Sequence, residues 1–151
     1  LKGHKIGFKT DQDKRTLKKL CALKKNHPDL KVLVSFGGWG ACYSCSNVFA
    51  LELYRKRFAE SGKDLLIEYG ADGFDMDFES PVIGGPPNHT ASKEDKANFT
   101  DLLKKLRNTL PKEMELSFDA NTFKRYIEES VECDSVMQYV DYVNLMSYSL
   151  P

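Results

Sequence analysis

The sequence predicts an α/β fold built on a parallel sheet. Four segments are typical of strands, and amphipathic helical segments lie between them, so that strand and helix alternate along the chain. This alternation predicts parallel strands joined by right-handed crossovers. Polar or aromatic residues follow each strand, at the edge where such sheets place their functional sites. These residues are Trp39, Glu79, Asp119 or Asn121, and Tyr148.

The first amphipathic pattern predicts a helix that begins near Lys14. Leu17, Leu20 and Cys21 recur at helical spacing and form its expected apolar stripe. The helix must end near Pro28, because the residue before a proline avoids the α region.

Residues 31–36 predict the first confident strand. They are almost all apolar and β-branched in the middle, which is typical of a strand buried on both faces. Gly37, Gly38, Trp39 and Gly40 follow, and glycine lets the backbone turn sharply and lets another group come close. Trp39 can either stack against the face of a sugar or pack inside the protein, and the sequence favours neither.

The strongest chemical signal lies in residues 72–79. Read as a strand, this stretch places the carboxyl groups of Asp75, Asp77 and Glu79 on one face and apolar side chains on the other. Neighbours on one face lie roughly 6.6 Å apart, so their titrations couple and at least one carboxyl keeps its proton above its ordinary pKa. A general acid needs such a proton. The alternation also fits a half-exposed strand with acids in water, but the flanking helical segments favour a covered sheet.

The segments on either side of this stretch have clear boundaries. A helical pattern runs from about Phe49 to Gly70, which is placed to end it in a left-handed cap. Residues 80–93 contain several prolines and glycines and predict a long loop at the carboxyl end of the acidic strand. His89, within that loop, is interpreted as a solvated residue rather than a catalytic one.

The remaining elements continue the alternation. Ser92 and Asp95 resemble a capping box that opens a third helix. Residues 114–118 predict a strand, residues 126–139 two short helices, and residues 141–148 a last strand. The third helix carries an apolar stripe of Phe99, Leu102, Leu103, Leu106 and Leu110.

Composition excludes some functions and leaves others open. The chain has 151 residues, enough for one modest domain, and 22 basic residues balance 22 acidic ones, which argues against a nucleic-acid partner. No apolar run approaches the length of a membrane span. The four cysteines do not form two C-x-x-C pairs, so a structural zinc site has weak support. Cys42 and Cys45 are either a small-loop disulfide, which secretion would favour, or two free thiols.

Taken together, these motifs resemble family 18 of the glycoside hydrolases, the chitinases and their relatives. Residues 72–79 match the family's D-G-x-D-x-D-x-E signature at every fixed position. Residues 31–39 resemble its S-x-G-G strand, residues 95–103 its next helix, and residues 143–148 its strand ending in M-x-Y. The resemblance runs in the family's order from about Leu20 to the last residue.

The resemblance implies a fold and a boundary. The family fold is an eight-stranded (β/α) TIM barrel of about 250 residues or more. The chain aligns with strands three to six of such a barrel, without strands one, two, seven and eight. Residues 1–151 are therefore expected to be a fragment of one catalytic barrel domain, with no second domain, and to be inactive alone.

The resemblance also implies a reaction, the hydrolysis of β-1,4-linked N-acetylglucosamine polymers such as chitin or chitooligosaccharides. The substrate's acetamido oxygen would act as nucleophile in a retaining mechanism. Glu79 would protonate the leaving oxygen, Asp77 would hold the acetamido N–H, Asp75 would share a proton with Asp77, and Tyr148 would bind the acetamido oxygen. No metal or cofactor is implied, and the location expected is extracellular, while the oligomeric state is left open. The residues expected to support or contact substrate are Ser35, Gly38, Trp39 and Met146.

Two other functions and several departures accompany this interpretation. A chitin-binding lectin on the same fold usually lacks the acid that Glu79 supplies, and an endo-β-N-acetylglucosaminidase acting on N-glycans shares the acidic signature. The family usually has tryptophan at Phe78, tyrosine at Ser80, and aspartate or asparagine at Ser149, where the sugar at the cleavage point is contacted. Asp72 has the opposite strand parity from the other acids and is interpreted as structural.

Overall fold

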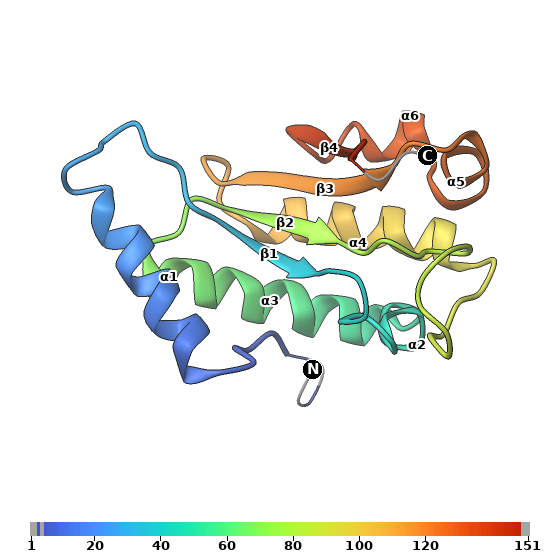
Figure 1. Cartoon of the computed structure of the whole chain (residues 1–151), viewed down its shortest axis with the longest axis horizontal. Helices are drawn as coiled ribbons and strands as arrows, with labels where there is room; N and C mark the ends of the chain where they lie inside the picture. Colours follow the sequence, from blue (N-terminus) through green and yellow to red (C-terminus); the bar gives the residue numbers. More distant parts are fainter. Residues whose placement is uncertain (1–2, 4, 149–151) are drawn as a thin grey trace.

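The computed structural model describes residue 3 and residues 5–148. Within that part, six helices and four strands alternate, which confirms the predicted α/β class (Figure 1). Their order is α1 (Asp11–Leu23), β1 (Leu33–Gly37), α2 (Cys45–Phe49), α3 (Glu52–Tyr69), β2 (Gly73–Asp77), α4 (Asp95–Thr109), β3 (Glu115–Asn121), α5 (Lys124–Ser130), α6 (Cys133–Val136) and β4 (Tyr142–Met146).

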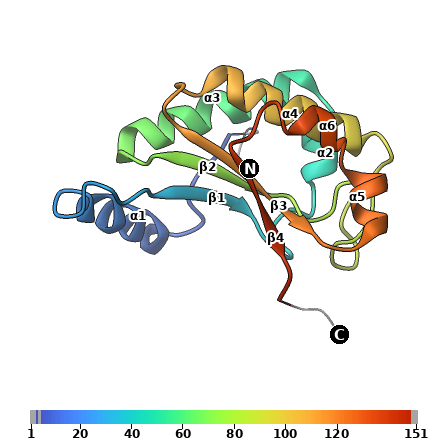
Figure 2. The ribbon, with the colours of Figure 1, turned by 90° about the horizontal axis from the view of Figure 1, so that it is seen from above.

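The four strands form one parallel sheet in the order β1-β2-β3-β4. The register places Ser35 and Ser117 on either side of Asp75, and Asp119 opposite Asn144. Figure 2 shows α3 and α4 together on one face of the sheet. The register therefore brings polar side chains from four strands to one place.

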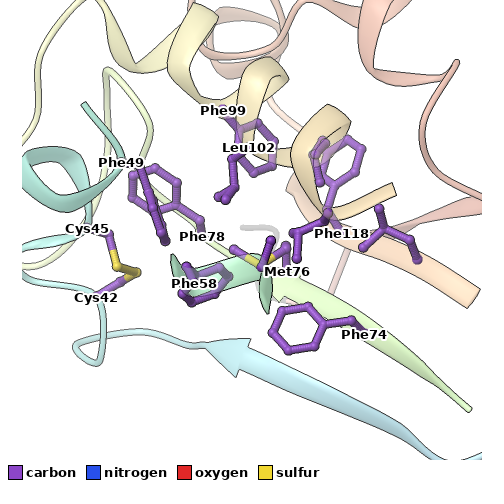
Figure 3. Close-up of a cluster of buried hydrophobic side chains, with 14 of the residues drawn as sticks. Cys42, Cys45, Phe49, Phe58, Phe74, Met76, Phe78, Phe99, Leu102 and Phe118 are labelled. Atoms are coloured by element: carbon purple, nitrogen blue, oxygen red, sulfur yellow. A yellow bond between two sulfur atoms is a disulfide. The ribbon is translucent and has the colours of Figure 1, made fainter. Parts of the chain in front are cut away.

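The hydrophobic core lies between the sheet and its helices. Phe74 and Met76 are 0% exposed and Phe78 is 1% exposed, so this face of β2 is fully covered. Phe58 of α3 packs edge-on against Phe74, and Phe99 of α4 packs edge-on against Phe78 (Figure 3). The predicted apolar stripe of α4 is buried along its length, which confirms that helix.

Local signals explain the helix ends. Helix α1 begins at Asp11 rather than near Lys14, because Thr10 and Asp13 form a capping box that the sequence interpretation did not use. Leu20 was expected on the buried stripe but is 43% exposed. The left-handed cap at Gly70 is confirmed, with φ of 71°.

The helices before β2 differ from their prediction, whereas those before β4 agree with it. The helix expected from about Phe49 is α3, which begins at Glu52, and the shorter helix α2 before it was not predicted; the chain is extended at Leu51 between the two. The two short helices expected in residues 126–139 are confirmed as α5 and α6.

Strand β1 differs most from its prediction. It was expected to be buried on both faces, but Ser35 is exposed and the other residues of the strand are only half-buried. The reason is its position at an edge, since β2 is its only neighbour within the described part of the chain. None of the helices in this part is long and apolar enough to cross a membrane.

Candidate active site

The face of β2 that points away from the helices carries the acidic file. Asp75 and Asp77 lie on the strand, and Glu79 lies two residues beyond it, at the start of the following loop. Asp75 is 8% exposed, whereas Asp77 and Glu79 are half-buried. The file therefore runs from a buried acid to acids that solvent and ligand can reach.

Asp75 accepts hydrogen bonds from the three other strands of the sheet. Ser35 of β1 donates to its Oδ2 at 2.8 Å, and Ser117 of β3 donates to its Oδ1 at 2.6 Å. The side-chain amide of Asn144 on β4 donates to the same Oδ1 at 3.2 Å. Hydrogen bonds from three sides fix the orientation of a buried carboxyl group and offset the loss of its water.

The other two acids have perturbed affinities for protons. Burial and then the charge of Asp75 raise the pKa of Asp77. Burial and then the charge of Asp77 raise the pKa of Glu79. The Oδ1 atom of Asp77 is buried and has no hydrogen-bond partner among the described residues, so it is available as an acceptor. An acid with a raised pKa and a buried oxygen without a partner thus lie next to each other.

Two glycines let β1 approach this file closely. Gly37 has φ of 127°, and a Cβ atom there would collide with the main-chain carbonyl of Asp77. Gly38 donates its N–H to that carbonyl at 3.0 Å, and its own Cβ position lies 3.5 Å from the Asp77 carboxyl group. A side chain at Gly37 would displace the strand end from the acids, and at Gly38 the φ of 95° favours glycine.

Trp39 lies at the mouth of the site, and its side chain is 66% exposed. Of the two interpretations of this residue, the structure therefore contradicts internal packing. Trp39 and Gly38 line a small pocket together with Glu79 and His89. The exposed ring is free to stack against a ligand beside the acid.

His89 is not the solvated residue that the sequence suggested. Its Nδ1 atom lies 2.9 Å from the carbonyl oxygen of Pro86, and its ring packs against Gly85. The Nε2 atom is buried without a partner among the described residues. The loop can fold back on itself because Gly85 has no side chain that would collide with the ring. Residue composition alone does not reveal this contact.

The loop that contains His89 is fastened to the segment after Trp39. Cys42 and Cys45 form a disulfide, which settles the alternative left by the sequence. Both the main-chain N–H and the hydroxyl group of Thr90 donate to the carbonyl of Tyr43, at 2.8 and 2.9 Å. The two loops beside Glu79 therefore support each other.

The last predicted site residues lie at the end of β4. Met146 is the final residue of that strand, is half-buried and pairs with Asn121. Tyr148 follows and is 81% exposed. The structure brings Tyr148 to the same edge of the sheet as the acids but does not place it in contact with them. The departure noted at Ser149 lies outside the described residues.

Asp72 has a structural role, as its parity indicated. Its carboxyl group accepts from Lys24 at 2.7 Å and from the main-chain N–H of Val32 at 2.8 Å. Burial would raise the pKa of Asp72, but these two donors outweigh it and lower the pKa.

Two residues of the site were missed or left ambiguous by the sequence interpretation. Asp119 lies on β3 opposite Asn144, and burial and then the charge of Asp75 raise its pKa to about 7. Tyr126 of α5 is 0% exposed, and its hydroxyl group has no partner in the part of the chain that the structure describes. Burial and then the charge of Glu79 raise the pKa of that hydroxyl group. The sequence placed Asp119 or Asn121 at the end of a strand, but the position of Asp119 on the same face as Ser117 and Asp75 becomes clear only with the register of the sheet.

A second polar contact also depends on the register. The side-chain amide of Asn121, at the end of β3, donates to the carbonyl oxygen of Glu79 at 3.1 Å. Within the described residues, no group of three or more His, Cys, Asp or Glu side chains could hold a metal ion. The chemistry that this arrangement offers is proton transfer by coupled carboxyl groups.

A parallel sheet with helices on one face and a file of acids on the other fits part of a (β/α) barrel. The model of the family "Glycosyl hydrolases family 18" matches residues 2–150. The chain belongs to this family.

The similar proteins are much longer than this chain. Chitinase A1 of Niallia circulans is 34% identical over 139 residues, which are 87% of this chain and 20% of that protein. The chitinase ChiW of Paenibacillus sp. str. FPU-7 has a TM-score of 0.82 and 40% identity, covering 92% of this chain and 13% of that one. A family 18 N-acetylglucosaminidase of Paenibacillus barengoltzii has a TM-score of 0.85 and 35% identity, covering 96% and 43%. The four strands are therefore part of a (β/α) barrel, and the chain spans less than half of each relative.

Proposed function

We propose that the protein containing this chain hydrolyses β-1,4-linked N-acetylglucosamine polymers, with Glu79 as the general acid. The observation that carries the proposal is the file of Asp75, Asp77 and Glu79 on the uncovered face of β2, with a raised pKa at its two outer members. Two of the similar proteins are named chitinases and one an N-acetylglucosaminidase, so the sugar is common to all three.

The geometry supports a separate role for each acid. Glu79 borders the pocket of Trp39, where a ring stacked on the indole would bring its glycosidic oxygen near a protonated carboxyl group. The unpartnered Oδ1 atom of Asp77 would accept an acetamido N–H, which would turn the acetamido oxygen towards the reacting carbon. Asp77 would also stabilise the positive charge of the intermediate, while Asp75, which Ser35 keeps in place, would share a proton with Asp77 and help to raise the pKa of the acid.

Other residues would act at the rim. Gly38 would keep the end of β1 close to the acids, and Tyr148 and Met146 would contact the acetamido group and the sugar from β4. We propose that residues 1–151 are one fragment of the catalytic barrel and inactive alone, because substrate would be bound on one side only. The Cys42–Cys45 disulfide supports an extracellular location, since such bonds persist in oxidising compartments.

The test is a comparison of Glu79→Gln with Glu113→Gln in the complete protein. Glutamine keeps the size of Glu79 but has no carboxyl proton, so we expect chitooligosaccharide turnover to fall roughly 10²- to 10⁴-fold. Glu113 is exposed and precedes β3, at the opposite end of that strand from the contact with Glu79, so its variant should keep full turnover. Equal turnover by Glu79→Gln would overturn the role of Glu79, and sugar binding without any cleavage by the wild type would indicate a lectin.

A further inference from the structure

Two asparagines of the chain stand in the N-x-Thr pattern that N-glycosylation requires. Asn88, with Thr90 two residues later, lies in the loop after β2. Asn98, with Thr100 two residues later, lies in α4. The sequence alone does not distinguish the two patterns, but the structure places them in different surroundings.

Asn88 lies at the exposed tip of a turn. The main-chain N–H of His89 donates to the carbonyl oxygen of Pro86 at 3.3 Å, which closes a four-residue turn with Pro87 and Asn88 at its centre. Asn88 has φ of 67°, a left-handed value that asparagine adopts more readily than most residues. It is exposed, and its side chain makes no hydrogen bond to another described residue. A sugar attached to its amide nitrogen would therefore extend into solvent.

Asn98 contacts the neighbouring helix instead. Its Oδ1 atom accepts from Arg55 of α3 at 3.2 Å, and Arg55 is only 7% exposed. Thr100 is buried, and its hydroxyl group donates to the carbonyl oxygen of Lys96 at 3.3 Å, one turn earlier in α4. A sugar on the amide group of Asn98 would crowd α3 and disturb the contact with a buried cation.

The loop that carries Asn88 is closed by the disulfide segment. Cys42 and Cys45 enclose Tyr43, whose carbonyl oxygen accepts from both the main-chain N–H and the hydroxyl group of Thr90. Disulfides form in the oxidising lumen of the secretory pathway, where N-glycosylation also takes place. The Thr90 hydroxyl group is free for recognition before the two loops meet, and Asn88 stays exposed after they have met. The folded chain therefore accommodates a sugar that was attached before folding.

We propose that Asn88 is the N-glycosylation site of this chain when it is secreted from a eukaryotic cell, and that Asn98 stays unmodified in the folded protein. In the transfer, the amide nitrogen of Asn88 forms a bond to the anomeric carbon of a lipid-linked oligosaccharide diphosphate. The bond between that carbon and the diphosphate oxygen breaks, and the lipid diphosphate leaves with the electron pair. The amide nitrogen gives up one proton to a base of the oligosaccharyltransferase, and nothing is oxidised or reduced.

The position of Asn88 also fixes where the glycan lies. Pro86 and His89, which belong to the same turn, line the pocket that Glu79 borders. The glycan therefore lies beside this pocket and on the outer side of the loop. The attachment itself does not depend on the proposed function, since it uses only the acceptor pattern and the exposure of Asn88.

The first experiment maps the glycan on the complete protein secreted from cultured insect cells. Peptide N-glycosidase in heavy-oxygen water converts a glycosylated asparagine to a labelled aspartate, which peptide mass spectrometry locates. A sample without the glycosidase is the control for spontaneous deamidation. We expect the label at Asn88 and none at Asn98. Secreted protein without the label at Asn88, or with the label at Asn98, would overturn the proposal.

The second experiment uses threonine variants that leave both asparagines in place. Thr90→Ala removes the hydroxyl group that the transferase recognises, so the label at Asn88 should be lost. Thr90→Ser keeps a hydroxyl group and should restore the label, and Thr100→Val is the matched control that should leave it unchanged. A label at Asn88 in Thr90→Ala would contradict attachment through this pattern.

A variant that changes only an exposed side chain covers the case in which Thr90→Ala is not secreted. Asn88→Gln leaves the contact between Thr90 and Tyr43 intact. We expect the intact mass of this variant to lack the glycan that the wild type carries. The same glycan mass on Asn88→Gln and on the wild type would overturn the proposal.

Discussion

The two faces of β2 are made by alternating residues of one five-residue strand, yet they meet opposite requirements. On the helix-covered face, Phe74, Met76 and Phe78 are almost completely buried and are packed by α3 and α4. On the other face, Asp75 and Asp77 depend on polar groups from neighbouring strands or lack a partner. The apolar face stabilises the folded chain. The acidic face holds carboxyl groups whose burial costs free energy.

The difference shows where stability and chemistry are separated in this fold. A buried aromatic ring needs only apolar neighbours at van der Waals distance, which any well-packed helix supplies. A buried carboxyl group needs donors at defined positions, and like charges beside it raise its pKa. Substitutions on the apolar face should therefore change mainly the free energy of unfolding. Substitutions on the acidic face should also change the pKa values of neighbouring carboxyl groups.

The largest expected effect on stability is on the apolar face. Phe74→Ala would leave a cavity beside Phe58 and should lower the free energy of unfolding by roughly 3–5 kcal/mol. Chemical denaturation of the complete protein measures this. The matched control is Phe123→Ala, because Phe123 is 51% exposed and its loss should cost much less. Similar losses for the two variants would mean that β2 is not the centre of the core.

The next effect lies on the acidic face and separates two adjacent acids. Asp75→Asn keeps the shape but places an amide N–H₂ against donors, so we expect roughly 1–3 kcal/mol of destabilisation. Asp77→Asn removes a charge whose Oδ1 has no partner, so it should cost less or stabilise the protein. Denaturation curves near pH 7 compare the pair. A larger destabilisation by Asp77→Asn would contradict the contrast between the hydrogen-bonded carboxyl group of Asp75 and the unpaired oxygen of Asp77.

Asp75→Asn should also change the proton affinity of its neighbours. The charge of Asp75 contributes to the raised pKa of both Asp77 and Asp119. Without that charge, both pKa values should fall towards the ordinary aspartate value. Carbon-13 NMR titration of the carboxyl groups measures the change. Unchanged values would leave burial as the sole cause.

The contrast between the two faces of β2 also shows which features the sequence could predict. Alternation along residues 72–79 predicted both faces of β2, because the side-chain period of a strand is fixed by its backbone. The stripe of α4 and the cap at Gly70 were equally local signals. Motif resemblance added the order of the acids and the glycines at Gly37 and Gly38.

The sequence could not predict the side-chain contacts between neighbouring strands. Ser117, Asn144 and Asp119 reach Asp75 through the pairing of β2 with β3 and of β3 with β4, and register is a property of the assembled sheet. Tyr126 was assigned correctly to a short helix. Its proximity to the acids depends on how α5 packs against the sheet after β3, which the sequence does not show. The exposure of β1 was missed because apolar composition does not reveal which strands flank it.

A smaller effect comes from Asp72, which shares the parity of Phe74 but is fully paired. The Lys24 and Val32 donors hold the folded-state pKa of Asp72 below its unfolded value of about 3.9. Its contribution, about 1 kcal/mol, is therefore present above that pH and is lost as pH falls through the folded-state pKa. Denaturation midpoints between about pH 6 and about pH 3 should fall less in Asp72→Asn than in the wild type. Parallel pH dependence of the two would contradict this pairing.

The smallest effect should come from Tyr126→Phe, which tests the boundary between the two faces. The ring of Tyr126 is fully buried, while its hydroxyl group lacks a partner among the described residues and interacts electrostatically with Glu79, Asp77 and Asp119. Removing an unpaired buried hydroxyl group removes a desolvation cost, so the variant should be within about 1 kcal/mol of the wild type, on the stabilised side. Denaturation of the ligand-free protein measures this. A loss above about 2 kcal/mol would mean that the hydroxyl group is paired in solution, and that the acidic face extends to α5.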